Sequence, residues 1–403
     1  MSEWHECTLG DFLTLQRGFD LTEHETTPGP YPVISSGGVA YSTTVPRVQG
    51  PGVVTGRKGV LGKVHFSPGP YWPHDTTLWV KDFKGANPRF VYYFLQSLPL
   101  ASLDAGASNP TLNRNHVHLL RVRVPDALTQ VRIADVLGAI DDMIENNRRR
   151  VALLEQVTRE IYREWFVRYR FPGHEAVPMV DSLLGPIPDG WAVVKLGDLA
   201  DIRRGISWDR ANETTAGGTP VVTIPNLRSH LELGGCTRLS QVTDTDRSRF
   251  QLCADDILLV GSNGNPERVG QAVRVPDGVE ALFASFLMCV RVVDRRTDAL
   301  LVYRQITDPE GLMSAVRVTA VGATSLRNLR ISALRDAAVL VPDEDSLKAF
   351  RVASHPMYRL MDSLDAANDR LAEMRDLLLP KLVTGQIDIS GLTIDRDIDE
   401  ATT

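Results

Sequence analysis

The chain has 403 residues, of which 43 % are hydrophobic and 23 % are charged. This length suits two or three domains, and the composition is typical of globular proteins. No apolar run is long enough to cross a bilayer, and the first residues lack the apolar core of a secretory signal. The four cysteines lie far apart. We therefore expect reduced thiols in a cytoplasmic protein, with no membrane partner, disulfide or metal site.

The net charge of −6 is unevenly distributed along the chain. The balance of Lys and Arg against Asp and Glu is +2 in residues 1–125 and +1 in residues 191–342. It is −3 in residues 126–190 and −6 in residues 343–403. The two near-neutral regions permit a nucleic-acid surface but do not require one.

Taken in order, the chain begins with motifs that recur. Trp4, Leu9-Gly10-Asp11 and Arg17-Gly18 reappear 187 residues later as Trp191, Leu196-Gly197-Asp198 and Arg204-Gly205. The similarity continues more loosely, for example between segments 106–126 and 321–343, and both copies end in Val-Pro-Asp. The repetition predicts two related domains, at 1–125 and 191–342.

Each copy is predicted to consist mostly of strands. Short runs of Val, Ile, Leu and Phe alternate with polar residues and are interrupted by Gly, Pro, Asn and Ser. Short helices are expected at 8–16, 88–98 and 298–307. The pattern predicts an α+β domain with a curved, mainly antiparallel sheet and long loops.

Residues 126–170 are predicted to form one long central helix. Its seam advances in steps of four and three residues, a period typical of a left-handed coiled coil. The seam residues are Ile133, Leu137, Ile140, Ile144, Asn147, Val151, Leu154, Thr158, Ile161 and Trp165. The Pro- and Gly-rich residues 171–190 then predict a linker.

A second helical region is predicted at 343–385, where Pro356 is expected to interrupt or restart the helix and Pro380 to close it. The predicted seam is Met357, Leu360, Leu364, Ala367, Leu371, Met374 and Leu378. The simplest arrangement is an antiparallel coiled coil of the two long helices, about 45–55 Å long, as a spacer between two globules. The acidic tail, 386–403, is expected to be frayed.

Polar and aromatic residues on the first helix allow two interpretations each. Asn147 could fix the register of the helix pair by a buried hydrogen bond, or the helices could diverge there and at Thr158 and admit water. Trp165, Phe166 and Tyr169 are expected to pack under a globule; the alternative is an exposed partner site.

Catalytic signatures are missing. There is no GxxxxGK[ST] phosphate-binding loop and no HExxH metal motif. Asn109-Pro110-Thr111-Leu112 is the nearest string to the Asn/Asp-Pro-Pro-Tyr/Phe motif of amino-methyltransferases, and it fails at two positions. We therefore expect a chain that is not an enzyme and has no catalytic residues.

The chain resembles the specificity subunits of type I restriction–modification systems along essentially its whole length. The resemblance rests on the two Trp…Leu-Gly-Asp…Arg-Gly openings, the Val-Pro endings, Trp165-Phe166 with Phe171-Pro172-Gly173, and RDLLLPKLVTGQI at 375–387. The chain departs from the family where Thr129 replaces an acidic residue before Gln130, and where Leu347 stands near the place of the matching glutamine.

The resemblance implies two target-recognition domains, 1–125 and 191–342, that read the halves of a bipartite, asymmetric double-stranded DNA site. The helices would set the unread spacer and dock two methyltransferase subunits and motor–nuclease subunits, in DNA methylation and phage defence. S-adenosylmethionine and ATP with Mg²⁺ would bind those partners and no cofactor this chain. With ~34 Å per ~10 bp, a spacer of 45–55 Å would put the half-site centres about 13–16 bp apart and leave a gap of about 8–13 bp. Globules that lean inward would shorten this gap, and we expect about 5–9 bp.

Polar side chains in loops are the predicted DNA contacts, because Arg, Lys and Asn can hydrogen-bond base edges or phosphates. Any single one of them is more often an ordinary surface group than a DNA contact. Arg17 and Arg204 could be structural or phosphate-binding as readily as base-reading. The candidates are Arg17, Arg57, Lys58, Lys63, His74, Asn113 and Arg114 in the first copy, and Arg204, Asn226, Arg228, Ser262, Asn263, Asn265, Arg268 and Arg327 in the second. A repeat-built adaptor with no DNA role stays open as the alternative.

Overall fold

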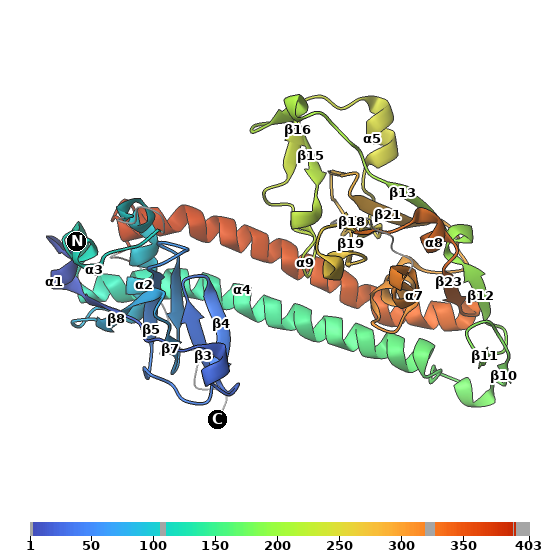
Figure 1. The fold of residues 1–403 in the computed structure, drawn as a ribbon, viewed down its shortest axis with the longest axis horizontal. Helices are drawn as coiled ribbons and strands as arrows, with labels where there is room; N and C mark the ends of the chain where they lie inside the picture. The colour runs from blue at the N-terminus through green and yellow to red at the C-terminus, as the bar shows by residue number, and fades with distance from the viewer. Residues whose placement is uncertain (1–2, 105–109, 319–326, 390, 392–403) are drawn as a thin grey trace. The chain divides into compact units, whose positions relative to one another are not determined.

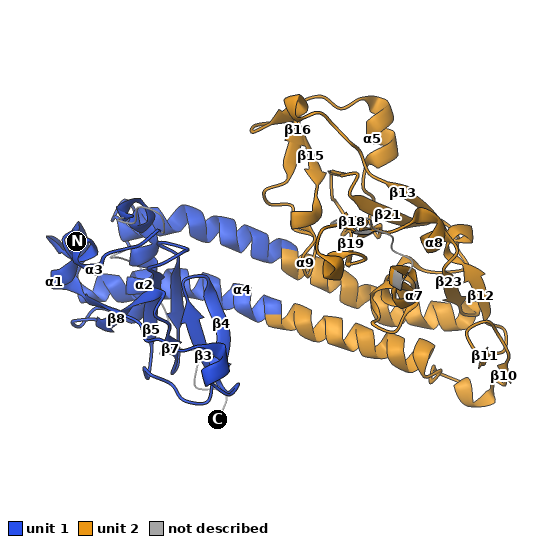
Figure 2. Ribbon diagram, viewed as in Figure 1, with its two compact units in different colours: residues 1–148, 366–403 blue, residues 149–365 orange. Residues whose placement is uncertain are grey.

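The computed structural model describes residues 3–104, 110–318, 327–389 and 391 (Figure 1). The chain forms two compact units (Figure 2). Unit 1 comprises residues 1–148 and 366–403, and unit 2 comprises residues 149–365. Each unit combines a β-rich part with one stretch of each long helix. This division falls within the two long helices, so it does not test the predicted domain boundaries at the ends of the β-rich parts, which stay predictions.

The β-rich part of unit 1 contains two small sheets and a strand pair. The four-stranded sheet is fully antiparallel, and the three-stranded sheet has one parallel contact, between β3 and β7. The sheet orders are β2 (Thr14–Arg17), β8 (Thr77–Asp82), β5 (Gly52–Gly56), β6 (Val64–Ser67); β4 (Gly38–Thr43), β3 (Tyr31–Ser35), β7 (Trp72–Pro73); and β1 (Trp4–Thr8) with β9 (Arg121–Pro125). The helices are α1 (Leu9–Phe12), α2 (Pro88–Ser97) and α3 (Arg114–His118).

Unit 2 repeats this plan with insertions. Its first sheet is antiparallel and its second again has one parallel contact, between β15 and β20. The strand order of the first sheet is β13 (Ala200–Arg204), β21 (Leu287–Val292), β17 (Ile257–Val260) and β19 (Ala272–Arg274). The strand order of the second sheet is β14 (Glu213–Thr214), β16 (Thr237–Leu239), β15 (Thr219–Val222) and β20 (Leu282–Phe283). Three further strand pairs are β12 (Ala192–Lys195) with β23 (Ala338–Val341), β18 (Ser262–Asn263) with β22 (Arg327–Asn328), and β10 (Met179–Val180) with β11 (Ile187–Pro188). The helices are α5 (Asp244–Phe250), α6 (Ala299–Thr307), α7 (Leu312–Val318) and α8 (Ile331–Arg335).

The repeated Arg-Gly pair marks the same crossing in both units. Gly18 lies against the backbone of His74, and a Cβ at Gly18 would overlap the carbonyl oxygen of His74. Gly205 lies equally close to the carbonyl oxygen of Phe283. Only glycine fits such an approach of two backbones, which explains why both copies keep it.

The predicted short helices are confirmed at α2 and α6. Asn87 and Asp298 accept hydrogen bonds from backbone amides in the first turns of these helices, as N-cap residues do. The helix predicted at 8–16 is wrong beyond Phe12. Residues Thr14–Arg17 form strand β2 because Leu15 must point into the core, where it is 1 % exposed, while its neighbours pair with β8.

The two long helices are α4 (Ala127–Tyr162), which ends in a π-helical turn (Arg163–Val167), and α9 (Glu344–Val383). Asp126 and Asp343, the last residues of the two Val-Pro-Asp endings, accept hydrogen bonds from the backbone amides of Thr129 and Ser346. Each repeat therefore closes by capping the long helix that follows it.

Neither proline acts as predicted. Pro356 lies within α9 and Pro380 lies in its last turns. A proline at 356 leaves the carbonyl of Val352 without its helical donor, but Val352 is 71 % exposed. Water can bind that carbonyl, so the helix continues. The helix ends instead at Val383, two residues before Gly385, whose φ is +74°.

The seam predicted on α4 is confirmed, with Ile133, Leu137, Ile140 and Ile144 all buried. The seam predicted on the second helix is partly wrong. Leu360 and Met374 are 39 % and 47 % exposed, while Tyr358 and Met361 are buried. The buried face of α9 is rotated because α9 packs against α4 and the β-rich part of each unit together.

In each unit the two helices run antiparallel. Within unit 1, Asp141 contacts Arg375 and Asn147 contacts Asn368. Residue numbers therefore increase along α4 where they decrease along α9. Within unit 2, the side chain of Phe166, beyond the end of α4, lies 5.2 Å from that of Phe350 between ring centroids. The predicted α+β class with two long antiparallel helices is confirmed.

The aromatic end of the first helix packs as predicted. Phe166 is 4 % exposed and lies 5.4 Å from the ring of Trp191, which Phe171 also contacts at 4.9 Å. At the other end of the chain, Ile389 is buried in the core of unit 1. The fraying predicted from residue 386 is therefore wrong for Ile389, while residues 390 and 392–403 lie outside the described residues.

Candidate nucleic-acid interface

All seven candidate residues of the first copy lie at one end of the four-stranded sheet of unit 1. Neighbouring strands run antiparallel, so the end of β2, the end of β5 and the starts of β6 and β8 share one edge. Arg17, the 57–63 loop and His74 therefore meet there. Lys58 also forms a β-bridge with Thr111, which places the nearby residues Asn113 and Arg114 at the same end of the sheet. We call residues 17–20, 57–63, 74–76 and 111–114 the loop end of unit 1.

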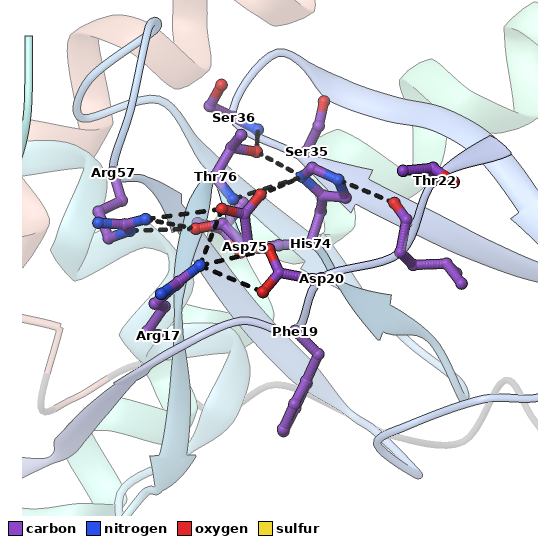
Figure 3. A network of polar contacts seen from close by, with 12 residues as sticks. Arg17, Phe19, Asp20, Thr22, Ser35, Ser36, Arg57, His74, Asp75 and Thr76 are labelled. Atoms are coloured by element: carbon purple, nitrogen blue, oxygen red, sulfur yellow. Dashed lines mark hydrogen bonds and ion pairs between the residues drawn. The ribbon is translucent and has the colours of Figure 1, made fainter. Parts of the chain in front are cut away.

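Asp75 is the centre of a polar network at this loop end (Figure 3). Nη2 of Arg17 donates to Oδ2 of Asp75 at 3.1 Å and lies 3.3 Å from Asp20. Nε and Nη2 of Arg57 both donate to the backbone oxygen of Asp75, at 3.0 and 2.9 Å. The network fixes the two loops and neutralises part of their positive charge.

His74 is held on both ring nitrogens. Nε2 lies 3.1 Å from the carbonyl oxygen of Leu21, which can only accept, so Nε2 carries the proton. Nδ1 lies 3.0 Å from the hydroxyl oxygen of Thr76, which in turn accepts from the backbone amide of Ser36. His74 therefore connects three loops rather than presenting a free imidazole.

The remaining candidates of unit 1 are exposed. Lys58, Asn113 and Arg114 are exposed, and the ammonium of Lys63 donates to the carbonyl oxygen of Gly37 at 3.1 Å. Asn113 caps α3 by accepting from the amide of Asn115. Lys58 and Arg114 are thus exposed cations of the loop end.

The eight candidates of the second copy gather at the corresponding end of the sheet in unit 2. Arg204 ends β13, Ser262 and Asn263 form β18 after β17, and Asn265 and Arg268 precede β19. The backbone of Arg327 in β22 pairs with Asn263. Arg268 donates to the carbonyl oxygens of Ile224 and Leu227, at 3.2 and 3.0 Å, which ties in the segment 226–228. The loop end of unit 2 comprises residues 204, 226–228, 262–268 and 327–328.

Several of these side chains form hydrogen bonds within the protein. Arg204 donates to the hydroxyl of Ser262 at 3.3 Å and to the carbonyl oxygen of Leu329 at 3.0 Å. Asn226 is 4 % exposed and donates to the carbonyl oxygen of Glu232. Ser262 is 3 % exposed and hydrogen-bonded to Asn328. These residues shape the loop end more than they present groups to solvent.

Other candidates of unit 2 are accessible. Arg228 is exposed and pairs with Glu232 at 3.0 Å. Asn265 is exposed and caps the turn that begins at Pro266, while the carboxamide oxygen of Asn263 accepts from the amide of Asn265. The backbone of Arg327 is in place, but its side chain lies outside the described residues.

Asp75 is the residue at the centre of this loop end that the sequence analysis did not single out. It stands two residues before β8, where Ser285 stands two residues before β21. Arg17 contacts Asp75, and the counterpart Arg204 contacts the carbonyl oxygen of Ser285. Extending the 187-residue repeat alignment into this loop could have paired them, but the offset changes there because unit 2 contains insertions.

The two loop ends share a backbone frame and differ in side chains. The amides of Arg57 and Lys58 both donate to the carbonyl oxygen of Thr76, and those of Gly261 and Ser262 both donate to Phe286. An exposed Lys58 therefore corresponds to a buried Ser262. The same scaffold offers different chemistry in each unit.

The described part of the chain contains neither a metal-binding cluster nor a membrane-spanning helix. There, no group of three or more His, Cys, Asp or Glu is arranged to hold a metal ion. None of the described helices is long and apolar enough to span a bilayer.

Comparison with known proteins gives matches to one group of proteins. Residues 1–156 match the model of the type I restriction modification DNA specificity domain. This chain is similar to the type I specificity subunits. It is 22 % identical to the type I restriction enzyme MjaIX specificity subunit of Methanocaldococcus jannaschii, over 76 % of this chain and 71 % of that one. It is 21 % identical to the HindI specificity subunit of Haemophilus influenzae, over 96 % and 100 %.

The fold also has a solved counterpart. The S subunit of a type I restriction–modification system from M. genitalium superposes with a TM-score of 0.61 at 16 % identity, covering 95 % of this chain and 96 % of that one. The resemblance read from the sequence is therefore confirmed. The expectation of a specificity subunit rather than an enzyme is also confirmed, because the named relatives are specificity subunits.

Proposed function

We propose that this type I specificity subunit reads a bipartite, asymmetric DNA site, with one loop end on each half. The observation that carries the proposal is the shared backbone frame with unlike side chains. Identical readers would recognise a symmetric site, whereas Lys58 in unit 1 and Ser262 in unit 2 occupy one position with different chemistry. Two unlike readers on one chain fit an asymmetric site.

The accessible residues suit base and phosphate contacts. Lys58 and Arg114 in unit 1, with Arg228 and Asn265 in unit 2, are exposed and carry donors that can reach guanine, adenine or phosphate oxygens. Arg17, Arg57, Arg204 and Arg268 hold the loops by bonds to backbone oxygens or to Asp75. The second group positions the first.

The long helices would set the spacing between the two halves. α4 has 36 residues and α9 has 40, which at ~1.5 Å per residue gives about 54–60 Å each. At ~34 Å per ~10 bp this length corresponds to about 16–18 bp of duplex, and we propose that the unread spacer is shorter, about 5–9 bp. The helices would also dock two methyltransferase subunits with S-adenosylmethionine and motor–nuclease subunits with ATP, in the cytoplasm.

The decisive experiment is methylome sequencing of cells that express this chain with its methyltransferase. We expect one methylated motif with two defined halves and an unread spacer. Replacing residues 1–125 by the matching segment of a relative should change one half and leave the other. A contiguous motif, or a change in both halves, would contradict the proposal.

Salt dependence of binding provides the second test. A DNA reader that contacts phosphates loses affinity steeply as salt rises, with a slope of about −0.9 per phosphate contact. The purified complex should show this slope on a duplex that contains the motif. Absence of duplex binding at low salt would favour the adaptor without a DNA role.

A further inference from the structure

The two long helices are counterparts within the internal repeat. Asp126 caps α4 and Asp343 caps α9, so a position on α4 corresponds to the position 217 residues later on α9. By this offset Asp141 corresponds to Tyr358, and Thr158 corresponds to Arg375. Each unit therefore contains one version of the same group of contacts, in which a short helix of the β-rich part meets both long helices. We call this group a layer; it contains Asp141 and Arg375 in unit 1, and Thr158 and Tyr358 in unit 2.

In unit 1 this layer is an ion pair with a phenol. The hydroxyl of Tyr93, on α2, donates to Oδ2 of Asp141 at 2.6 Å, and Nη1 of Arg375 donates to Oδ1 of Asp141 at 2.9 Å. The side chains of Arg375 and Asp141 are 28 % and 22 % exposed. The anion is on α4 and the cation is on α9.

In unit 2 the same layer has different chemistry. Arg304 of α6 is six residues after the N-cap of its helix, as Tyr93 is in α2. Nη2 of Arg304 donates to the hydroxyl of Thr158 at 2.6 Å and lies 3.5 Å from Glu155, both on α4. Its guanidinium also lies over the ring of Tyr358 on α9, 5.4 Å from the centroid. Here the cation is on the β-rich part and its carboxylate is on α4.

A second polar contact in unit 1 has the same asymmetry. Nδ2 of Asn147 donates to Oδ1 of Asn368 at 3.0 Å, and Asn368 is 9 % exposed. Their counterparts in the repeat are Leu364 and Val151, which are apolar. An asparagine in a helix pair is satisfied only when another polar group faces it.

We infer that these two polar layers make the face of α4 specific for α9 of the same chain, and exclude pairing between two copies of one half. An α4–α4 pair in the same register would place Asp141 against Thr158, without a cation, and Asn147 against Val151. An α9–α9 pair would place Arg375 against Tyr358, and therefore near Arg304, which lies over that ring. Arg304 would also be without Glu155, which is on α4. Asn368 would face Leu364. Arg375 would keep only its neighbour Asp376.

The physical reason is that a wrong pairing leaves partly buried charges and amides without partners. Such groups cost more when unpaired than they contribute when paired. The apolar seam positions are similar in both helices, so apolar packing alone would also permit α4–α4 and α9–α9 pairs. The polar layers disfavour these pairs of identical helices. The inference concerns pairing alone and does not depend on the proposed DNA site.

The test uses the full chain, cut after folding. Leu183 is 90 % exposed, between β10 and β11, so a protease site inserted there can be cleaved in the folded protein. The nicked protein is unfolded in urea, refolded and weighed by native mass spectrometry. We expect only the pair of one N-terminal and one C-terminal fragment. A statistical mixture that includes pairs of identical fragments would overturn the inference.

A matched variant assigns this selectivity to the polar layers. In this variant Asp141→Asn and Arg375→Gln remove the charges of the first polar contact of unit 1, and Asn147→Leu with Asn368→Val removes the amide pair of the second. We expect pairs of identical fragments to appear after refolding. The control variant, Asn146→Leu with Asp369→Asn and Arg370→Gln, changes exposed positions of the same helices and should pair like the natural chain. Equal behaviour of the two variants would refute a role for the layers.

Intact protein provides a measurement that does not require refolding of fragments. Arg375→Asp should lower the urea midpoint, because two carboxylates then face each other, and adding Asp141→Arg should restore most of the loss. The same Asp141→Arg change alone should also lower the midpoint. Absence of recovery in the double variant would show that this layer does not select the partner helix.

Discussion

Nη2 of Arg17 lies 3.1 Å from Oδ2 of Asp75 at the loop end of unit 1. The side chain of Arg17 is 51 % exposed and that of Asp75 is 16 % exposed, so the carboxylate cancels part of the charge that a DNA backbone would meet. At the proposed DNA surface, affinity should therefore depend on this internal acid as well as on the exposed cations.

Asp75→Asn is expected to strengthen non-specific DNA binding. The substitution keeps the backbone oxygen that Arg57 uses and removes one negative charge, so the salt slope should steepen by up to about 0.9. Stability should fall by only about 1 kcal/mol, because the lost ion pair is partly exposed. Fluorescence anisotropy against salt measures the slope. Asp82→Asn, at the opposite end of β8, is the control, and an equal change there would refute the role of Asp75.

Lys58 and Arg57 are adjacent but should behave differently. Lys58→Ala is expected to weaken DNA binding and flatten the salt slope, with stability changed by less than about 0.5 kcal/mol, because its side chain is exposed. Arg57→Ala should lower stability by about 1–3 kcal/mol, because two hydrogen bonds to Asp75 are lost. Anisotropy and urea unfolding separate the two effects. The reverse pattern would move the DNA contact to Arg57.

The cap of α9 should stabilise unit 2 at neutral pH. Asp343 accepts from the amide of Ser346 at 2.8 Å and from the indole of Trp191 at 2.7 Å. Burial raises the pKa of Asp343, but these hydrogen bonds outweigh it and hold the pKa below its usual value. Asp343→Ala should cost about 1–2 kcal/mol at pH 7.

The pH dependence of that cap has a definite sign. A lowered pKa means that the stabilisation is complete above the unfolded-state pKa, near ~3.9, and is lost as the pH falls through it towards the folded-state value. The difference between natural and Asp343→Ala chains should therefore shrink below pH ~4 in urea unfolding. Asp345→Ala, an exposed change in the same turn, should show little effect at any pH.

His118 should make unit 1 less stable in mild acid. Its Nε2 accepts from the backbone amide of Leu15 at 2.9 Å, which requires a neutral ring. Burial, with Arg114 and Lys84 nearby, lowers the pKa of His118. The unfolded chain therefore binds the proton first, and stability falls as the pH drops through about 6.5. His118→Gln should flatten that part of the urea-midpoint profile, whereas the exposed His24→Gln should leave it unchanged.

Gly18→Ala should be strongly destabilising. The added Cβ would overlap the carbonyl oxygen of His74, so the crossing of the two backbones must open, at a cost of about 2 kcal/mol or more. Gly69→Ala is the matched control, because nothing lies within 4 Å of a Cβ at that glycine. Thermal unfolding of both variants decides the point. Equal midpoints would show that the Arg-Gly pair is kept for another reason.

Local chemistry in the sequence determined much of the fold. The 187-residue repeat, the two Val-Pro-Asp caps and the seam of α4 could all be predicted, because caps and periodicity act between near neighbours in the chain. The candidate DNA residues were predicted from residue type alone, and the antiparallel sheets gather each set at one edge. Their contacts with DNA stay predictions.

Only the tertiary structure decided which polar groups are free and which face of α9 is buried. Asn226 and Ser262 are buried because loops distant in sequence close over them. The face of α9 is turned to Tyr358 and Arg375 because the β-rich parts contact it as well as α4, and Pro356 is tolerated because its side of the helix meets water. These outcomes depend on long-range packing and solvent exposure, which periodicity along one chain does not specify.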